Sequence, residues 1–330
     1  MNNISPFSIH KYSLITLLVV FFSNCFPISI LAQSVPKPAN ESSAKDYEAL
    51  VNLALEQVKN KDVAKAIESC SQAIRLKNDR IEAYFVRGMI YSKTRYQPKD
   101  ALDRMLTPLG GQNNHLAEAD FTKCVEIAPK FQQGYLYLGM VQVKTKPYDE
   151  MALPLKNLDE AIRLNPNDPS AYYFRAEANR QNSSFTKAAY GELTKEKNRI
   201  RSLALADYTK YINLAPASDA MRGYLGRGQA YFEIEKFDLA IADTSRFIEK
   251  NTENEDAYLV RGRSYLELKK DTQAVEDLTK AIGIHESHDN DSSFDMFRIE
   301  VYQARAEAFG KLGKKKEAKA DEDAAKQVVS

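Results

Sequence analysis

The sequence predicts an all-α chain built from about seven consecutive helical hairpins. Four similar segments place an aromatic residue, an arginine three residues later, a small residue, and another aromatic: EAYFVRGMIY, RGYLGRGQAY, DAYLVRGRSY and EVYQARAEAF, starting at positions 82, 222, 256 and 300. This is helical spacing. A second kind of segment lies between them, as in EADFTKCVEIAP at 118, LADYTKYINLAP at 205, IADTSRFIEKN at 241 and VEDLTKAIGI at 275. Each unit is therefore a helix A followed by a helix B.

The unit resembles the tetratricopeptide repeat (TPR), whose period is about 34 residues. Position 4 of that pattern is large, and here it holds Leu50, Tyr84, Tyr135, Tyr172, Tyr224, Tyr258 and Tyr302. Position 8 is small, and here it holds Ala54, Gly88, Gly139, Ala176, Gly228, Gly262 and Ala306. Position 20 is alanine except for Pro154 in unit three. The resemblance implies a right-handed α-solenoid over residues 46–328, in which neighbouring units bury each other's apolar faces.

The amino terminus has the features of an export signal. Lys11 precedes an apolar run, and a small residue, Ala32, ends the segment. This order is typical of a secretory signal peptide. We therefore expect residues 1–32 to be removed, residues 33–45 to form a linker, and the mature protein to be periplasmic or secreted. Two alternatives remain open: an uncleaved membrane anchor at residues 12–32, and lipidation of Cys25.

Five units share a charged pair. Arginine at position 7 of helix A occurs only in units that have aspartate at position 23 of helix B, and these positions are equally far from the hairpin apex. We expect five ion pairs within hairpins: Arg87–Asp120, Arg175–Asp207, Arg227–Asp243, Arg261–Asp277 and Arg305–Asp321. A site for a charged ligand is the alternative. Units one and three have Leu53 with Ser69 and Leu138 with Asn157 instead.

The resemblance places a concave groove on the helices A, at positions such as 5 and 9. The lysine and asparagine with which some family members bind acidic tails are absent there. An apolar stripe takes their place, formed by Phe85, Met89, Leu136, Met140 and Tyr173. Such a surface suits a peptide or protein partner. The alternative is that inserted segments cover the stripe.

Two long insertions interrupt the turns between helices A and B, at residues 92–116 and 180–203. A site formed by these insertions would make the protein an envelope enzyme or an enzyme accessory. The chain has no phosphate-binding glycine loop and no HExxH, GxSxG or CxxC motif, and only four histidines. We therefore expect a non-catalytic scaffold that needs no cofactor.

Composition bounds the other classes of function. The chain has 46 basic and 45 acidic residues, so it lacks the positive surplus of a nucleic-acid binder. Cys70 and Cys124 fall at core positions, which favours buried thiols over a disulfide. His285 and His288 lie in a polar turn that we expect to be solvated and not metal-bound.

Overall fold

A computed structural model describes residues 41–93, 113–147, 150–185, 192–287 and 296–328. These residues form fourteen α-helices and no strand, which confirms the predicted all-α class. The expected signal peptide and the first part of the linker lie outside the described residues. The helices group into two compact units, one ending at Pro166 and one beginning at Asn167.

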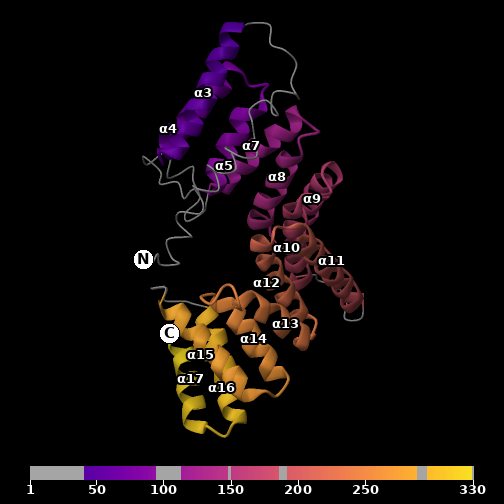
Figure 1. The fold of residues 1–330 in the computed structure, drawn as a ribbon, viewed down its shortest axis with the longest axis vertical. Coiled ribbons are helices and arrows are strands. Elements are labelled where there is room, and N and C mark those ends of the chain that lie inside the picture. The colour runs from indigo at the N-terminus through magenta and orange to yellow at the C-terminus, as the bar shows by residue number, and fades with distance from the viewer. Residues whose placement is uncertain (1–40, 94–112, 148–149, 186–191, 288–295, 329–330) are drawn as a thin grey trace. The chain divides into compact units, whose positions relative to one another are not determined.

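The amino-terminal unit contains three hairpins (Figure 1). Its helices are α3 (Glu41–Lys59), α4 (Val63–Leu76), α5 (Ile81–Lys93), α7 (Asn114–Ile127), α8 (Gln132–Thr145) and α9 (Ala152–Leu164). Each helix A packs on its own helix B, and each helix B packs on the next helix A of the unit. Most of the first insertion lies outside the described residues.

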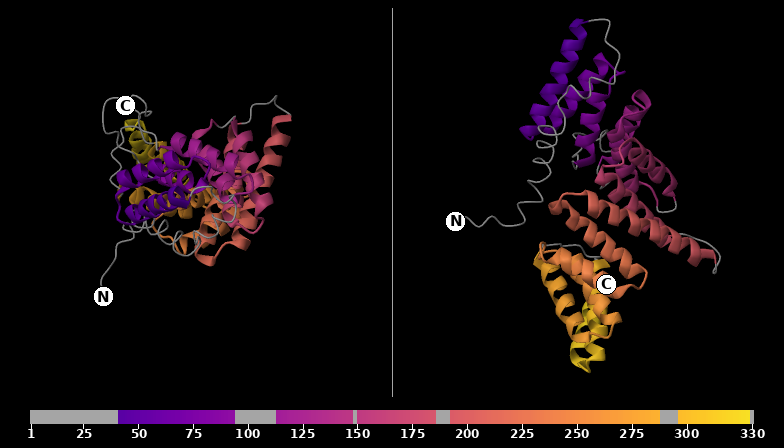
Figure 2. Two further views of the ribbon diagram at one scale, coloured as in Figure 1. Left: turned by 90° about the horizontal axis from the view of Figure 1, so that it is seen from above. Right: turned by 45° about the vertical axis from the view of Figure 1, so that its right-hand side comes forward.

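The carboxyl-terminal unit contains four hairpins (Figure 2). Its helices are α10 (Pro169–Phe185), α11 (Glu192–Leu214), α12 (Ala217–Glu233), α13 (Phe237–Ile248), α14 (Glu255–Glu267), α15 (Asp271–Ser287), α16 (Met296–Lys311) and α17 (Lys315–Gln327). The described part of the second insertion lengthens α10 and α11. Residues 186–191 of it are outside the described chain.

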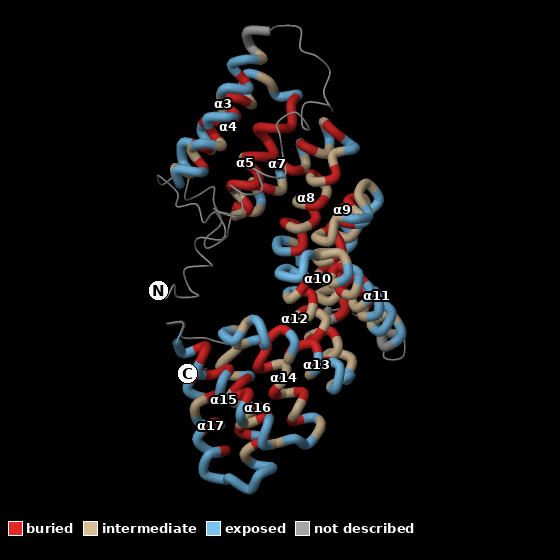
Figure 3. Tube along the Cα trace, viewed as in Figure 1, coloured by how far each residue is buried: buried red, intermediate tan, exposed pale blue. Residues whose placement is uncertain are grey.

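Small residues let the two helices of a hairpin approach closely. A Cβ atom added to Gly262 of α14 would lie 2.9 Å from Cγ of Leu278, and one added to Gly139 of α8 would lie 2.7 Å from Cγ of Leu158. Figure 3 shows the resulting strips of buried residues along the helices. The position-20 alanines of helix B are buried on the other side of the contact, for example Ala274 at 0% exposure.

Pro154 does not disrupt the third hairpin. It is the third residue of α9, and it is buried where other hairpins have alanine. The first amide groups of a helix have no acceptor within the helix, so a proline in the first turn removes no hydrogen bond.

The uninterrupted hairpins share one turn geometry. The residue at position 15 adopts a left-handed backbone in four of them: Lys61 (φ 63°), Glu235 (φ 62°), Lys269 (φ 59°) and Gly313 (φ 75°). Only the last of these is glycine, the residue best suited to positive φ.

The last helix, α17, is mostly exposed and charged (Figure 3). The inner face of α17 consists of its three buried residues, Ala318, Asp321 and Ala325. A polar outer face keeps the end of a repeat array soluble. Among the described residues, no helix has the length and apolar character that a membrane span requires.

Candidate functional site

The structure places all five arginines beside the aspartates expected for them. In each hairpin Nε of the arginine donates to one carboxylate oxygen and Nη2 donates to the other. The Nε distances are 2.9 Å for Arg87, 2.8 Å for Arg175, and 2.7 Å for Arg227, Arg261 and Arg305. The Nη2 distances lie between 2.7 and 2.9 Å. This fork geometry is the strong bidentate form of the interaction.

These pairs are largely removed from solvent. The aspartate side chains are 5–10% exposed, and the arginine side chains are 16–26% exposed. Burial raises the pKa of Asp120, and the hydrogen bond and charge of Arg87 oppose that rise. The hydrogen bond to Asp243 raises the pKa of Arg227. Both carboxylate oxygens of each aspartate are committed to the arginine, so the pairs serve the hairpin and leave little capacity for a ligand.

A third contact, which the sequence reasoning missed, ties successive hairpins together. The remaining nitrogen, Nη1, donates to a hydroxyl on helix B of the preceding hairpin. The pairs are Arg87–Ser71 (2.9 Å), Arg227–Thr209, Arg261–Ser245 and Arg305–Thr279 (each 3.1 Å). All four hydroxyls lie at position 25, two residues after the position of the aspartate. The recurrent Asp-x-Ser/Thr pattern in the segments at 205, 241 and 275 was the available signal.

Hairpins one and three replace the ion pair with neutral hydrogen bonds. Ser69 donates to Oε1 of Gln57 at 2.8 Å, and Asn157 donates to Oε1 of Gln142 at 2.7 Å. Both glutamines occupy position 11 of helix A. A polar residue at position 23 therefore has a partner in these hairpins without a buried charge.

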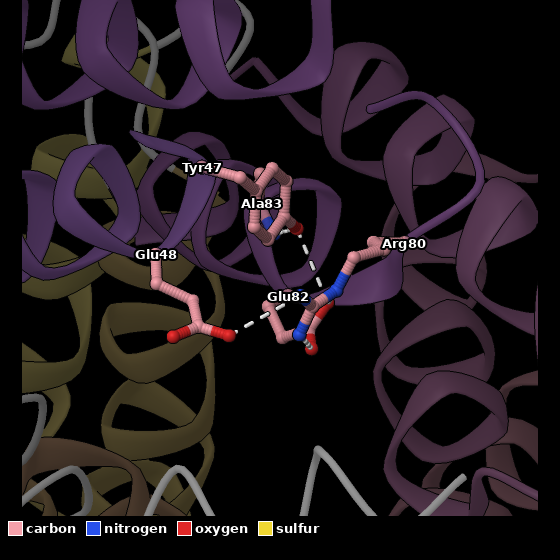
Figure 4. Close-up of polar contacts among 5 residues, drawn as sticks. All are labelled: Tyr47, Glu48, Arg80, Glu82 and Ala83. Atoms are coloured by element: carbon pink, nitrogen blue, oxygen red, sulfur yellow. Dashed lines mark hydrogen bonds and ion pairs between the residues drawn. The ribbon is translucent and has the colours of Figure 1, made fainter. Parts of the chain in front are cut away.

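A buried polar cluster joins α3 to the start of α5 (Figure 4). The hydroxyl of Tyr47 donates to Glu82 (3.1 Å) and accepts the amide hydrogen of Ala83 (3.0 Å). Arg80 binds Glu82 at 2.5 Å and Glu48 at 3.4 Å, and its guanidinium carbon lies 4.7 Å from the centre of the Tyr47 ring. Burial, followed by the charge of Glu82, raises the pKa of Tyr47. The cluster is internally satisfied and fixes the first hairpin on the second.

The expected apolar groove is not open as a whole, and the expectation is wrong for three of its five residues. Phe85, Met89 and Leu136 are buried, at 1%, 0% and 6% exposure, and only Met140 and Tyr173 are partly exposed. The cover on Phe85 comes from the neighbouring rings of Phe121, Phe131 and Tyr137, with centroids 5.1–5.8 Å away. Aromatic side chains of helices α7 and α8 and of the connection between them thus complete the core around Phe85.

The second unit has a charged cluster on its helices A. Arg180 of α10 binds Glu177 of the same helix at 3.1 Å and Glu233 of α12 at 3.0 Å. Glu177 also accepts a 2.5 Å hydrogen bond from the buried hydroxyl of Tyr208. Helices α11 and α12 can approach each other closely here because Gly226 has no Cβ atom. An added Cβ would lie 2.5 Å from the Tyr208 ring. One arginine thus pairs with two glutamates, and the cluster ties three helices together.

The other candidate residues, two cysteines and His285, lie within the packed interior of the described chain. The thiols of Cys70 and Cys124 are buried and form no disulfide, and burial raises the pKa of Cys70 to about 12. Their reactivity is therefore low. The expectation of a solvated turn is wrong for His285, which is buried on α15, lies 3.2 Å from Glu255 and stacks on Phe297. His288 lies outside the described residues. Within the described chain, no group of three histidine, cysteine or acidic side chains could hold a metal ion.

Comparison with known families agrees with the hairpin geometry. Tetratricopeptide repeat models match residues 155–198 and 203–289, and residues 47–80. The chain belongs to the tetratricopeptide repeat family. Its general class is that of a protein-interaction scaffold.

Three known proteins are similar to this chain, one in sequence and two in structure. Hsp70-Hsp90 organizing protein 3 of Arabidopsis thaliana is 27% identical over 143 residues, which are 43% of this chain and 22% of that protein. The Cut9-Hcn1 hetero-tetramer of the APC/C has a TM-score of 0.56 at 12% identity, over 90% of this chain and 46% of that chain. A tetratricopeptide repeat protein from Parabacteroides merdae has a TM-score of 0.49 at 16% identity, over 90% of this chain and 98% of that chain. The chain spans less than half the length of the first two.

Proposed function

We propose that this protein is an exported, non-catalytic scaffold that binds a protein or peptide partner through the exposed faces of its helices A. One observation carries the proposal. Position 13, in the last turn of helix A or at its end, is buried in none of the seven hairpins, and position 9 is buried only at Met89. Positions 8, 20 and 23, by contrast, lie in the contact between the two helices of a hairpin.

The similar proteins support the general class of this function. The Arabidopsis relative is named as an organizing protein for two chaperones, and the Cut9 structure is that of a protein assembly. Those partners belong to those proteins. For this chain the partner is proposed only as a protein or peptide that contacts the helix A faces.

Export is the second part of the proposal and rests on the order Lys11, apolar run, Ala32. Amino-terminal sequencing of the mature protein from the native host should begin near Gln33. Full-length protein found only in the cytosol would contradict export and leave the scaffold proposal standing.

Affinity capture from an envelope extract of the native host tests the scaffold directly. The full mature chain should retain one or a few proteins in amounts comparable to its own. Repeated failure to retain any protein, with a folded chain as bait, would contradict the proposal.

A further inference from the structure

Lys93, the last residue of α5, is a partly buried lysine. Two residues of the same helix turn, Ile90 and Ser92, are 1% and 5% exposed, so the end of the helix that carries Lys93 is packed. The Lys93 ammonium has no hydrogen-bond or ion-pair partner among the described residues. Lysine side chains are usually exposed or paired, so an unpaired and partly buried ammonium is energetically unfavourable.

A second lysine adds positive charge at this end of the helices. Lys144 is the last residue but one of α8 and occupies position 13, as Lys93 does in α5. The rings of Phe85 and Tyr137 hold α5 beside α8, with centroids 5.5 Å apart. The matching positions therefore place both lysines at the same end of two neighbouring helices.

A carboxylate on the helix between them is engaged by other groups. Glu118 of α7 accepts a hydrogen bond from the side-chain amide of Gln142 at 3.0 Å. The same oxygen of Glu118 lies 3.0 Å from Nζ of Lys146. Lys93 thus lies near another cation, while this carboxylate neutralises a different lysine.

These surroundings disfavour the charged form of Lys93. Burial, followed by the charge of Lys144, lowers its pKa to about 8. The negative end of the α5 dipole acts in the opposite direction, since it stabilises a cation, and it is outweighed here. At pH 7.5 about a quarter of the Lys93 amines are neutral, against roughly one in a thousand for a lysine of ordinary pKa. A lysine that is desolvated or beside another cation can act as a nucleophile near neutral pH.

We propose that Lys93 is a modification site, at which the ε-amine reacts reversibly with carbon dioxide to form a carbamate. The lone pair of Nζ forms a bond to the carbon atom of CO2. One carbon–oxygen π bond opens, which leaves the negative charge on oxygen, and a proton passes from the nitrogen to water. No atom is oxidised or reduced, and the reverse reaction restores the amine.

The charge of the surroundings favours CO2 over other small electrophiles. An acyl donor would convert Lys93 to a neutral amide, whereas CO2 converts it to an anion. The anion attracts the positive charge of Lys144, which the ammonium form repels. Carbon dioxide is also small and uncharged, so it can reach a partly buried amine. The site does not depend on the proposed scaffold function.

The test equilibrates the full mature chain with carbon-13 CO2 at about pH 7.5, close to the pKa of Lys93. A triethyloxonium salt converts carbamates to stable ethyl esters, and mass spectrometry of the peptides measures the label at each lysine. Lys59 is the matched control within the same chain, because it occupies position 13 of α3 but is exposed. Three variants accompany the wild type: Lys93→Arg removes the reactive amine, Lys144→Met removes the neighbouring charge, and Lys144→Arg keeps that charge.

The label at Lys93 should exceed the label at Lys59 by at least about tenfold, because far more of its amine is neutral. Lys93→Arg should abolish this label. Lys144→Met should lower the label at Lys93 by at least about threefold, and Lys144→Arg should preserve it. Equal label at Lys93 and Lys59, or label at Lys93 that Lys144→Met does not change, would overturn the proposal.

A trace of acetic anhydride separates a reactive amine from a carbamate site. If Lys93 is acetylated ahead of Lys59 but gains no carbamate, it is a nucleophile for acyl donors only, and the CO2 proposal is wrong. Affinity capture is independent of this result: a partner retained by both the wild type and Lys93→Arg would support the scaffold whichever way the labelling falls.

Discussion

Arg261 and Asp277 are joined across the hairpin of α14 and α15 by two hydrogen bonds, of 2.7 and 2.8 Å, that occupy both carboxylate oxygens. The same guanidinium reaches Ser245 on the preceding helix. In four hairpins one arginine therefore serves two functions: it closes its own helix pair and it links that pair to the previous one. The repetition of this geometry along the chain indicates a structural device and argues against a ligand site at position 7.

Breaking one pair should be costly. Arg261→Leu leaves the carboxylate of Asp277, only 9% exposed, without its partner, and should lower the free energy of unfolding by about 3–5 kcal/mol. Denaturant unfolding followed by circular dichroism measures the change. The triple variant Arg261→Leu/Tyr265→Gln/Asp277→Asn copies the neutral arrangement of hairpin three and should recover most of the loss. An Arg261→Leu chain as stable as wild type would contradict the role of the pair.

The link between hairpins should contribute less. Ser245→Ala removes one hydroxyl acceptor of Arg261 and should lower the free energy of unfolding by about 0.5–1.5 kcal/mol. Ser218→Ala is the control, because Ser218 is exposed and bonds only to Asp219 beside it. Equal midpoints for the two variants would show that the third contact has no energetic value.

The close approach of helices should depend on Gly262. Its added methyl group would lie 2.9 Å from Cγ of Leu278, so Gly262→Ala should cost about 1–3 kcal/mol. Gly283→Ala on α15 meets no atom within 4 Å and should instead stabilise by about 0.5–1 kcal/mol. Thermal unfolding should therefore move in opposite directions for the two alanine variants.

The left-handed residue at position 15 of the turn also allows two variants with opposite expected effects on stability. Lys269→Gly should raise the free energy of unfolding by about 0.5–1 kcal/mol, because glycine accepts a positive φ without steric cost. Gly313→Ala should lower it by a comparable or larger amount, since alanine is strained at φ 75°. If both changes destabilise, the turn backbone is not the controlling factor.

Lys93 should make stability depend on pH in a defined window. Its folded pKa, about 8, lies below the ordinary value of 10.5, so the unfolded chain binds more protons between these values. The destabilisation is complete below pH 8 and disappears above pH 10.5. Lys93→Met should therefore be more stable than wild type at pH 7, and the difference should vanish at high pH. A difference that does not change across this window would contradict the lowered pKa.

The parts predictable from sequence are those set by a fixed period. The hairpins follow from the recurrence of aromatic and small residues, and the position of Asp277 opposite Arg261 follows from equal distances to the apex. The contact with Ser245 also had a signal in the sequence, a hydroxyl residue that recurs two positions after the aspartate. That contact joins two successive hairpins and does not lie within one hairpin.

The burial of Phe85 could not be predicted from its own helix. Its cover comes from Phe121, Phe131 and Tyr137, whose positions depend on how α5, α7 and α8 pack. The Tyr47 cluster depends on the contact of Tyr47 with Glu82, 35 positions away, which the repeat pattern does not predict. The same helix A position can be exposed in one hairpin and buried in another, because the neighbouring hairpin decides which side chains cover it.

Photo-crosslinking within one hairpin tests most directly that the partner contacts the helix A faces. A photoreactive residue replaces Gln229 on α12 in one variant and Leu239 on α13 in the other, both expressed in the native host. Leu239 is a demanding comparison, because it is a large apolar side chain with 47% exposure on helix B. Crosslinks to a discrete partner from position 229 and none from position 239 are expected. Crosslinks from position 239 alone would place the binding surface on the helices B and contradict the proposed function.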